Sequence, residues 1–390
     1  MKYDRSFFDA GIDRRGTRCV KWDAAELVKP GDLPMWVADW DFRCAEPIVQ
    51  ALRQRAEHPC YGYSCSDPKD KEAFCGYWQR RHGVTITPDQ TCMLPCVVTG
   101  IRQMVLTFTQ PGEGAIIMTP LYGPFHDAVN RSQRRMVDIP LIPGEDARYM
   151  IDFDGVEKAL RDGVRLILFC NPHNPVSRAW RKEELERLVA LANAYGALIL
   201  SDEIHADFVY KPLSFVSMLS IPGAEKCTVM LAAASKTFNI PGLQQAMMVS
   251  YNPELLKKLS DNLELQGITS GNAFALPATQ AAYTQCDDWL DGMLAYLDES
   301  RGILKEEIAR LLPQAVLTPI EATALSWLNL RAYNPSSAEL NSKIRAHHLV
   351  INDGSWFGKE NGDGFMRLNF ACPHAMLREG VRRLAEALNE

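Results

Sequence analysis

The chain has 390 residues, of which 47% are hydrophobic and 23% are charged, and its formal net charge is −6. These proportions are typical of a folded globular protein, and the acidic balance argues against a general affinity for nucleic acid. The length exceeds what one small core needs, so we expect a large domain with a smaller companion.

Targeting signals and metal motifs are not evident in the sequence. No stretch approaches the roughly 18 apolar residues of a membrane span, and the N-terminus lacks the apolar core of a secretory signal. The 11 cysteines are scattered from Cys19 to Cys372 without a Cys-x-x-Cys pair, the spacing that zinc and redox sites favour. We therefore expect a cytoplasmic protein with no metal site, no membrane association and no nucleic-acid partner.

The clearest secondary-structure pattern lies in the middle of the chain. It predicts a short helix over 154–163, a strand over 164–170, an amphipathic helix over 181–196 that ends at Gly196, and a strand over 197–200. The strands are continuous apolar runs, which are typical of parallel sheets covered by helices on both faces. The pattern predicts a doubly wound α/β layer.

From residue 289 onward the pattern changes. A long helix is predicted over 291–312, strands over 324–330 and 364–370, and a terminal helix over 377–390. This succession indicates a separate α+β domain. We expect an N-terminal segment (1–50) that packs with the small domain, a large domain (51–288) and a small domain (289–390).

Three apolar runs of the predicted sheet each end in polar residues. The run over 166–170 leads to Asn174, that over 197–200 leads to Asp202, and that over 228–234 leads to Ser235 and Lys236. Ligands of open parallel sheets bind just beyond the carboxyl ends of the strands. The sequence therefore predicts that an amide, a carboxylate and an amine meet at one edge of the sheet.

These side chains suit an aldehyde cofactor. Lys236 is a candidate nucleophilic amine, because the small residues before it admit a planar cofactor and partial desolvation raises the fraction of free amine. Asp202 would hold the protonated ring nitrogen that pyridoxal phosphate needs as an electron sink. Asn174 would donate to the ring oxygen of that cofactor.

Each residue also has an explanation without a ligand. Lys236 would be a loop lysine in solvent, Asp202 a helix N-cap, and Asn174 a turn residue before proline. His205 would be a half-buried histidine with satisfied hydrogen bonds. The order and the shared position of the residues favour the cofactor site over these separate explanations.

Several segments resemble one enzyme family. "SDEIH" (201–205), "SKTFNIPGL" (235–243), "TPLYGPF" (119–125) and "GFMRLNFACP" (364–373) resemble the aspartate-aminotransferase superfamily of pyridoxal-phosphate enzymes, fold type I. Within it they are similar to the MalY/PatB group of carbon–sulfur β-lyases, and the match extends from Trp22 to the last helix. The resemblance implies a large domain with a mostly parallel, seven-stranded sheet, a smaller α+β domain, and a homodimer with shared active sites.

The resemblance also implies roles for individual residues. Lys236 would bond covalently to the cofactor, Asp202 would pair with the pyridine nitrogen, Tyr122 would stack on the ring, and Asn174 and His205 would contact the ring oxygen. The phosphate would be held by the backbone of Val97 and Val98, by Ser235, and by Tyr63 from the neighbouring subunit. Arg367 would bind the substrate α-carboxylate through two parallel hydrogen bonds, with Tyr63 nearby. Without a ligand, Arg367 would be part of a surface ion pair.

Four positions depart from the pattern of the superfamily. Ala233 stands where a phosphate-binding hydroxyl is usual, and Gln244 where aminotransferases place a phosphate-binding arginine. Leu94 replaces a common glycine, and "NPVS" (174–177) replaces the usual "NPTG". The loss of the hydroxyl at position 233 predicts weaker anchorage of the phosphate or a compensating contact elsewhere.

The resemblance implies a β-elimination at cystathionine, cysteine or a cysteine S-conjugate, which yields a thiol, pyruvate and ammonia. An aminotransferase with the same site residues is the alternative, since residue spacing does not separate the two reactions. A binding or regulatory protein with little activity is a third hypothesis, against which the presence of Lys236, Asp202 and Arg367 argues. Trp36, Trp40 and Trp356 receive no role.

Overall fold

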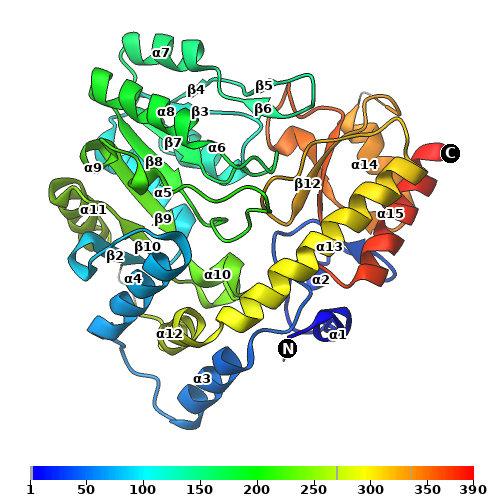
Figure 1. Cartoon of the computed structure of the whole chain (residues 1–390), viewed down its shortest axis with the longest axis horizontal. Helices are drawn as coiled ribbons and strands as arrows, with labels where there is room; N and C mark the ends of the chain where they lie inside the picture. The colour runs from blue at the N-terminus through cyan, green and yellow to red at the C-terminus, as the bar shows by residue number, and fades with distance from the viewer. Residues whose placement is uncertain (1–2, 269–270, 335) are drawn as a thin grey trace.

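The computed structural model in Figure 1 describes residues 3–268, 271–334 and 336–390. Seven strands of this part of the chain form one sheet in the order β2–β10–β9–β8–β7–β3–β4. β10 is antiparallel to both of its neighbours, and the other adjacent pairs are parallel. The strands are β2 (Thr91–Leu94), β3 (Gly114–Ile117), β4 (Arg135–Asp138), β7 (Leu166–Cys170), β8 (Leu198–Asp202), β9 (Thr228–Ala232) and β10 (Ala246–Val249). The mostly parallel seven-stranded sheet is thus confirmed.

Both faces of this sheet are buried. In β7, Leu166 and Leu168 belong to one hydrophobic cluster and Ile167 and Phe169 to another. Successive side chains of a strand point to opposite faces, so a continuous apolar run serves two cores at once. This explains why the middle of the sequence lacks the alternation of a half-exposed sheet.

Helices supply the other half of each core. The first cluster includes residues of α5 (Val97–Phe108), α6 (Gly123–Asn130) and α11 (Pro253–Leu265), and the second includes residues of α7 (Phe153–Arg161), α8 (Lys182–Tyr195) and α9 (Ala224–Cys227). Figure 1 shows α7 and α8 over the strands β7 and β8. The doubly wound layer predicted from the sequence is therefore confirmed.

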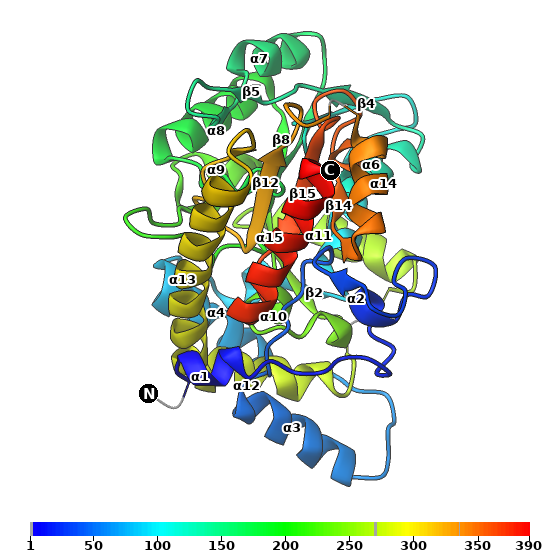
Figure 2. The same cartoon turned by 90° about the vertical axis from the view of Figure 1, so that its right-hand side faces the viewer.

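A second sheet lies apart from the first. Its order is β11–β12–β15–β14 and its pairs are antiparallel. The strands are β11 (Val316–Leu317), β12 (Leu325–Asn329), β14 (Asn352–Asp353) and β15 (Phe365–Asn369), and the helices beside them are α13 (Asp287–Leu311), α14 (Ser337–Ala346) and α15 (His374–Asn389). Figure 2 shows α13 and α15 next to this sheet. The predicted strands and helices of the smaller α+β unit are thus confirmed.

The N-terminal residues contact the C-terminal part of the chain. β1 (Leu33–Pro34) pairs in parallel with β13 (Leu349–Val350). The helices before the large sheet are α1 (Arg5–Asp9), α2 (Val20–Asp23), α3 (Glu46–Glu57) and α4 (Pro68–His82), and α12 (Ala275–Gln285) packs against α3 and α4. The remaining elements are the hairpin β5 (Ile142–Pro143) and β6 (Tyr149–Met150), the short helix α10 (Ala234–Thr237) and four 3₁₀ turns, η1 (Pro88–Gln90), η2 (Met218–Ser220), η3 (Pro241–Leu243) and η4 (Gly354–Trp356). The domain boundaries at 50 and 288 stay a prediction.

The predicted end of α8 agrees with its cap, whereas the predicted start of α7 does not. Gly196 adopts φ 63° after α8 and its backbone N–H donates to the last turn, which only glycine does without strain. α7 begins one residue earlier than predicted, because the Asp152 side chain accepts a hydrogen bond from the Gly155 N–H and caps it.

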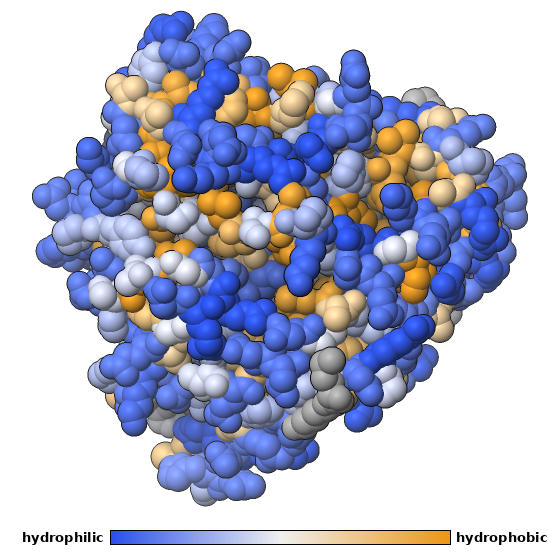
Figure 3. Space-filling model, in the orientation of Figure 1, coloured by the Kyte–Doolittle hydropathy of each residue, from blue (hydrophilic) through white to orange (hydrophobic). Residues whose placement is uncertain are grey.

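Hydrophilic residues predominate on the face shown in Figure 3, and hydrophobic ones lie there in separate small areas. Within the described residues, no helix is long and apolar enough to cross a membrane.

Candidate active site

The ends of three neighbouring strands bring the predicted polar residues together. In the strand register Cys170 lies opposite Asp202, and Asp202 lies opposite Leu231, five residues before Lys236. A cavity of about 150 Å³ lies beyond these ends. Its lining includes ten residues that the sequence pointed to, namely Val97, Val98, Tyr122, Asn174, Asp202, His205, Ser235, Lys236 and, as departures, Ala233 and Gln244.

Lys236 lies in α10, directly after β9. It is half-buried, and its Nζ donates to the backbone O of Ala38 at 2.5 Å. Desolvation lowers the pKa of this amine to about 8, against which the nearby Asp39 carboxylate acts. An amine with such a pKa is partly unprotonated near neutral pH and is nucleophilic. The explanation of Lys236 as a loop lysine in solvent is therefore wrong.

Asp202 is the last residue of β8 and is 4% exposed. Its Oδ1 accepts a hydrogen bond from the Ile204 N–H at 3.1 Å, and turns rather than a helix follow it, so the N-cap explanation is wrong. Burial raises the pKa of the Asp202 carboxyl to about 7. A buried carboxyl of this kind would gain from a cationic partner within the cavity.

His205 is buried as well. Among the described residues no hydrogen-bond partner faces its Nδ1, so the explanation as a satisfied histidine is wrong. Burial lowers the pKa of His205 to about 3, which keeps the imidazole neutral. A buried ring nitrogen without a partner costs free energy unless a ligand or water meets it.

Arg367 lies in β15, on the small-sheet side of the site, and is 3% exposed. Its Nη1 donates to Asn174 Oδ1 at 3.1 Å, and its Nη2 donates to the Trp36 backbone O at 2.7 Å and to Asn352 Oδ1 at 2.6 Å. No ion pair joins Arg367 to a carboxylate of the described residues, and its Nε has no hydrogen-bond partner there. The explanation as a surface ion pair is wrong, and the buried guanidinium is free to take an anion.

The first turn of α5 also borders the cavity. Val97 and Val98 line it, and the side chain of Cys96, the N-cap, contacts the Thr99 hydroxyl but accepts no hydrogen bond from the first backbone N–H groups of the helix. The first amides of a helix lack partners and the helix dipole favours an anion there. Gln244 and Gln245 line the same cavity, and their amides are candidates for the contact that Ala233 does not supply.

Tyr122 and Tyr63 differ in position. Tyr122 is the residue before α6, makes no side-chain hydrogen bond to that helix and lines the cavity, and burial raises the pKa of its phenol, which stays protonated. Tyr63 is fully exposed and does not line the cavity. The single chain therefore brings together every predicted site residue around Lys236 except Tyr63.

The sequence did not reveal the segment that covers Lys236. Ala38 accepts the hydrogen bond from the lysine, and the Trp40 indole donates to the Lys236 backbone O at 2.6 Å. The side-chain amides of Asn239 and Asn369 bind the backbone of residues 37–42. The segment includes "ADWDF" (38–42), but local residue spacing does not predict that a backbone carbonyl will accept a hydrogen bond from a distant lysine.

A buried carboxylate also supports α10. Asp207 accepts hydrogen bonds from Tyr77 and from Thr237, each at 2.7 Å, and lies 3.2 Å from His82 Nε2. Charge from His82 lowers the pKa of Asp207 in spite of its burial. Because Thr237 follows Lys236, this network fixes the residue next to the reactive amine.

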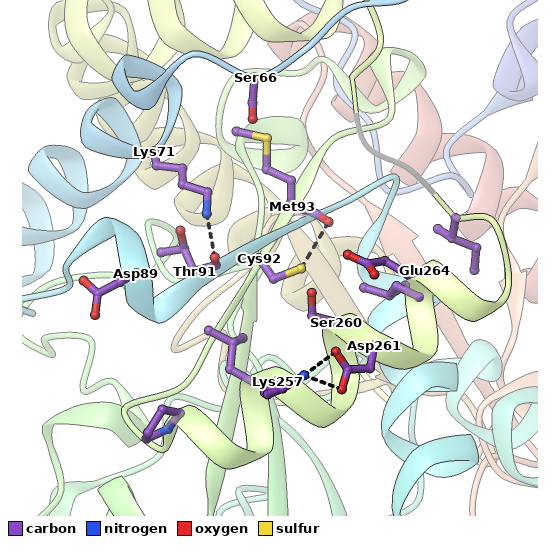
Figure 4. Close-up of a pocket in the computed structure, with 14 residues that line it drawn as sticks. Ser66, Lys71, Asp89, Thr91, Cys92, Met93, Lys257, Ser260, Asp261 and Glu264 are labelled. Carbon is purple, nitrogen blue, oxygen red and sulfur yellow. Dashed lines mark hydrogen bonds and ion pairs between the residues drawn. The ribbon is translucent and has the colours of Figure 1, made fainter.

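A second pocket, between α4, β2 and α11, lies away from this site (Figure 4). Lys71 donates there to the Thr91 backbone O at 2.9 Å, and Lys257 pairs with Asp261 at 2.7 Å. Its cations are thus engaged within the protein, whereas the cavity at Lys236 contains an unpartnered buried nitrogen, Nδ1 of His205. We take the cavity at Lys236 as the candidate active site.

The sequence profile of a known family, aminotransferase class I and II, matches residues 38–384. The chain belongs to this family. It is 39% identical to cystathionine beta-lyase PatB of Bacillus subtilis, with 98% of this chain and 100% of the relative aligned, and 30% identical to protein MalY of Escherichia coli over 98% of each.

Solved structures agree with this placement. The PLP-bound C–S lyase of Staphylococcus hominis is 31% identical, with a TM-score of 0.90 over 98% of each chain. Cystalysin of Treponema denticola, which contains pyridoxal 5'-phosphate, is 28% identical, with a TM-score of 0.94 over 100% of this chain and 99% of that chain. The large and small sheets described above thus have the arrangement of these enzymes.

Proposed function

We propose that the chain is a pyridoxal-phosphate-dependent carbon–sulfur lyase. The cavity fits the cofactor, because it holds a lysine amine of lowered pKa, a buried carboxyl and an unpartnered imidazole nitrogen at one sheet edge. Lys236 would hold the aldehyde, Asp202 the ring nitrogen, Asn174 and His205 the ring oxygen, and Tyr122 the ring face. Val97, Val98 and Ser235 would hold the phosphate.

One observation carries the proposal. Lys236, Tyr122 and Ala38 line both the cofactor cavity and the adjoining pocket that contains Arg367. The amine therefore lies between the group that would bind the cofactor and the group that would bind a substrate carboxylate. An amine so placed reaches the Cα of an amino acid held by Arg367.

The proposed reaction breaks the Cα–H and Cβ–S bonds of a sulfur amino acid. When bound, the cofactor supplies an electron sink for the charge left on Cα. Lys236 acts as the general base that removes the Cα proton, for which a pKa near 8 is suited. The sulfur leaves with the Cβ–S electron pair and takes up a proton as a thiol. Water then releases the remaining three-carbon fragment as pyruvate and ammonia.

The other residues bind and orient. Arg367 would hold the α-carboxylate through Nε, which has no partner among the described residues, and Asn174 fixes the guanidinium through Nη1 at 3.1 Å. Asp202, ionised beside the ring nitrogen of the bound cofactor, would keep that nitrogen protonated, which is an electrostatic role. The neutral His205 accepts or donates one hydrogen bond without adding charge.

The experiment that tests this proposal follows pyruvate and free thiol from L-cystathionine, L-cysteine and S-methyl-L-cysteine without any 2-oxo acid. A lyase forms both products in proportion to time. Silence until 2-oxoglutarate is added, followed by transfer of the amino group, would instead identify an aminotransferase.

We further propose a homodimer with shared sites in the cytoplasm. The full exposure of Tyr63 supports this, because the phosphate-binding role assigned to it requires a second chain. The acidic composition and the scattered cysteines are consistent with a reducing compartment.

A further inference from the structure

A third pocket, which we call the basic pocket, is lined by two separate parts of the chain. The part that carries the large sheet supplies Arg148, Arg181 and residues 210–213, and the later part supplies residues of α13 and residues 317–321. The basic pocket has a volume of about 750 Å³ and shares no lining residue with the cavity at Lys236 or with the pocket that contains Arg367. A ligand held there would contact both parts of the chain.

The lining of the basic pocket carries more positive than negative charge. It contains five cations and two carboxylates, which leaves three positive charges, whereas the whole chain has a net charge of −6. These residues are Arg148, Arg181, Lys211, Arg301 and Lys305, against Asp298 and Glu321. Like charges around one opening repel one another and attract anions. The excess therefore indicates an anionic ligand.

The carboxylate of Glu321 offsets only part of this charge. Its side chain is 6% exposed and is shared by three arginines, namely Arg178 at 2.7 Å, Arg148 at 3.0 Å and Arg181 at 3.4 Å. Arg178 also pairs with Glu184 at 2.9 Å, and Arg148 lies 3.9 Å from the exposed Asp146. Among the described residues the Arg181 side chain has no other ion pair. The guanidinium of Arg181 is thus left with a share of one carboxylate.

Two lysines of the basic pocket are not engaged with the protein. Lys211 and Lys305 are exposed, and within the part of the chain that the structure describes their side chains make neither an ion pair nor a hydrogen bond. Asp298, the second carboxylate of the lining, pairs instead with Arg301 at 2.5 Å. The two ammonium groups, one from each part of the chain, are therefore available to a ligand that spans the pocket.

The types of cation favour phosphate oxygens as the anion. A guanidinium binds two such oxygens through parallel hydrogen bonds, and an ammonium adds a point charge that adapts to the remaining ones. A single phosphate monoester carries about two negative charges near neutral pH, fewer than the excess of the lining. The volume also lies within the range of small-molecule sites, roughly 300 to 1,000 Å³. A ligand with more than one phosphate group matches both the charge and the space.

We propose that the basic pocket is a second ligand site, distinct from the active site, and that it binds a polyphosphate. Lys211, Lys305 and Arg181 contact the phosphate oxygens, and the buried Glu321 fixes the guanidinium groups around them. Because the ligand joins two parts of the chain, its binding stabilises the folded protein. The inference does not depend on the lyase function, since the two sites have no residue in common.

Calorimetric titration of the holoenzyme with pyrophosphate tests the proposal, and the bound cofactor keeps the phosphate site at α5 occupied. We expect one pyrophosphate per chain. The Lys211→Ala/Lys305→Ala variant should bind it about tenfold or more weakly, because even in water an ammonium about 4 Å from an anion retains a measurable attraction. Lys226→Ala/Lys258→Ala is the matched control: it removes the same charge from two exposed lysines outside the pocket and should bind as the wild type does.

Thermal unfolding gives a second readout. Pyrophosphate should raise the Tm of the wild type and of the control variant, and it should raise that of Lys211→Ala/Lys305→Ala much less. Sulfate at the same ionic strength should bind at least about tenfold more weakly than pyrophosphate, because it brings less charge to the site. Absence of pyrophosphate binding, equal binding by the two double variants, or sulfate binding as tight as that of pyrophosphate would each overturn the inference. None of these results bears on the lyase function.

Discussion

At the residue scale, burial sets the chemistry of the site. It raises the pKa of Asp202 to about 7 and lowers that of Lys236 to about 8, because desolvation disfavours the charged form of each. A protein that keeps both groups in one cavity accepts a loss of stability that a bound cofactor can offset. The pH dependence of the free energy of unfolding measures this loss.

The Asp202→Asn variant should be more stable than the wild type without cofactor near neutral pH. A carboxyl with a raised folded-state pKa contributes stability below about pH 4 and loses it as the pH rises to about 7. The difference in unfolding free energy should therefore grow over that range, by up to about 4 kcal/mol. Urea unfolding of the cofactor-free proteins at several pH values measures it.

Asp207→Asn is the matched control for this experiment, since Asp207 is also buried but its pKa is lowered. Its carboxylate contributes stability above the unfolded pKa and loses it as the pH falls. This variant should be less stable than the wild type at neutral pH. If both variants shifted in the same direction, burial would not govern the pKa of Asp202.

Arg367→Lys tests the carboxylate site. Lysine keeps the charge but lacks the two-pronged guanidinium. The transition-state stabilisation measured by kcat/KM for sulfur amino acids should therefore fall by about 2 kcal/mol, mostly through a higher KM. Arg331→Lys is the control, because both arginines lie over an aromatic ring, Arg367 at 4.7 Å from the centre of Phe357 and Arg331 at 4.8 Å from that of Phe365, but Arg331 is exposed. Equal KM values for the Arg367→Lys variant and the wild type would remove Arg367 from the substrate site.

Residue types near strand ends were enough to predict Lys236, Asp202 and Asn174, because strand order brings them to one edge. Resemblance, rather than spacing, supplied Arg367, Tyr122 and the phosphate-binding amides. Ala38, Asn352 and Gln245 were missed, since a backbone carbonyl or a distant amide acquires its role only when the chain folds.

At the scale of elements, strand ends and the covering segment 36–42 together position the amine. Two cations from earlier in the chain bind this segment. Arg14 pairs with Asp39 at 2.7 Å and with Asp41 at 3.0 Å, and the buried Lys21 pairs with Asp41 at 2.6 Å. Burial of the two carboxylates makes these cations necessary. The long parallel strands were predictable from their apolar runs, whereas this loop-to-loop network was not.

Arg14→Ala should destabilise the protein by about 2 to 4 kcal/mol, because it leaves two poorly exposed carboxylates with one cation. Arg15→Ala is the neighbouring control: Arg15 is 70% exposed and, among the described residues, pairs only with the exposed Asp13, so we expect a destabilisation of less than about 1 kcal/mol. Denaturant unfolding of the two variants decides. Equal effects would show that the charges around Asp39 do not hold the segment.

At the scale of the whole molecule, the two sheets meet at the active site. Lys236 comes from the large sheet, Arg367 from the small one, and Ala38 from the N-terminal residues. We propose the division at residues 50 and 288 on this basis. Sequence pattern predicted both sheets, but it gave no account of the pocket between them, which depends on side chains from distant parts of the chain.

Shared active sites predict complementation between inactive chains. Lys236→Ala and Tyr63→Ala each damage a site, but a mixed dimer has one site with both residues intact. Random assortment of co-expressed chains should restore about a quarter of wild-type pyruvate release, and sedimentation should give a dimer. No recovery in mixed dimers would place Tyr63 outside the neighbouring site.

Attachment of the cofactor to Lys236 can be tested by reducing the purified holoenzyme with borohydride and mapping the modified peptide by mass spectrometry. We expect one pyridoxyl group per chain, on Lys236, and none in the Lys236→Ala variant. A label on another lysine, such as Lys21 or Lys71, or cofactor that stays unattached throughout, would contradict it.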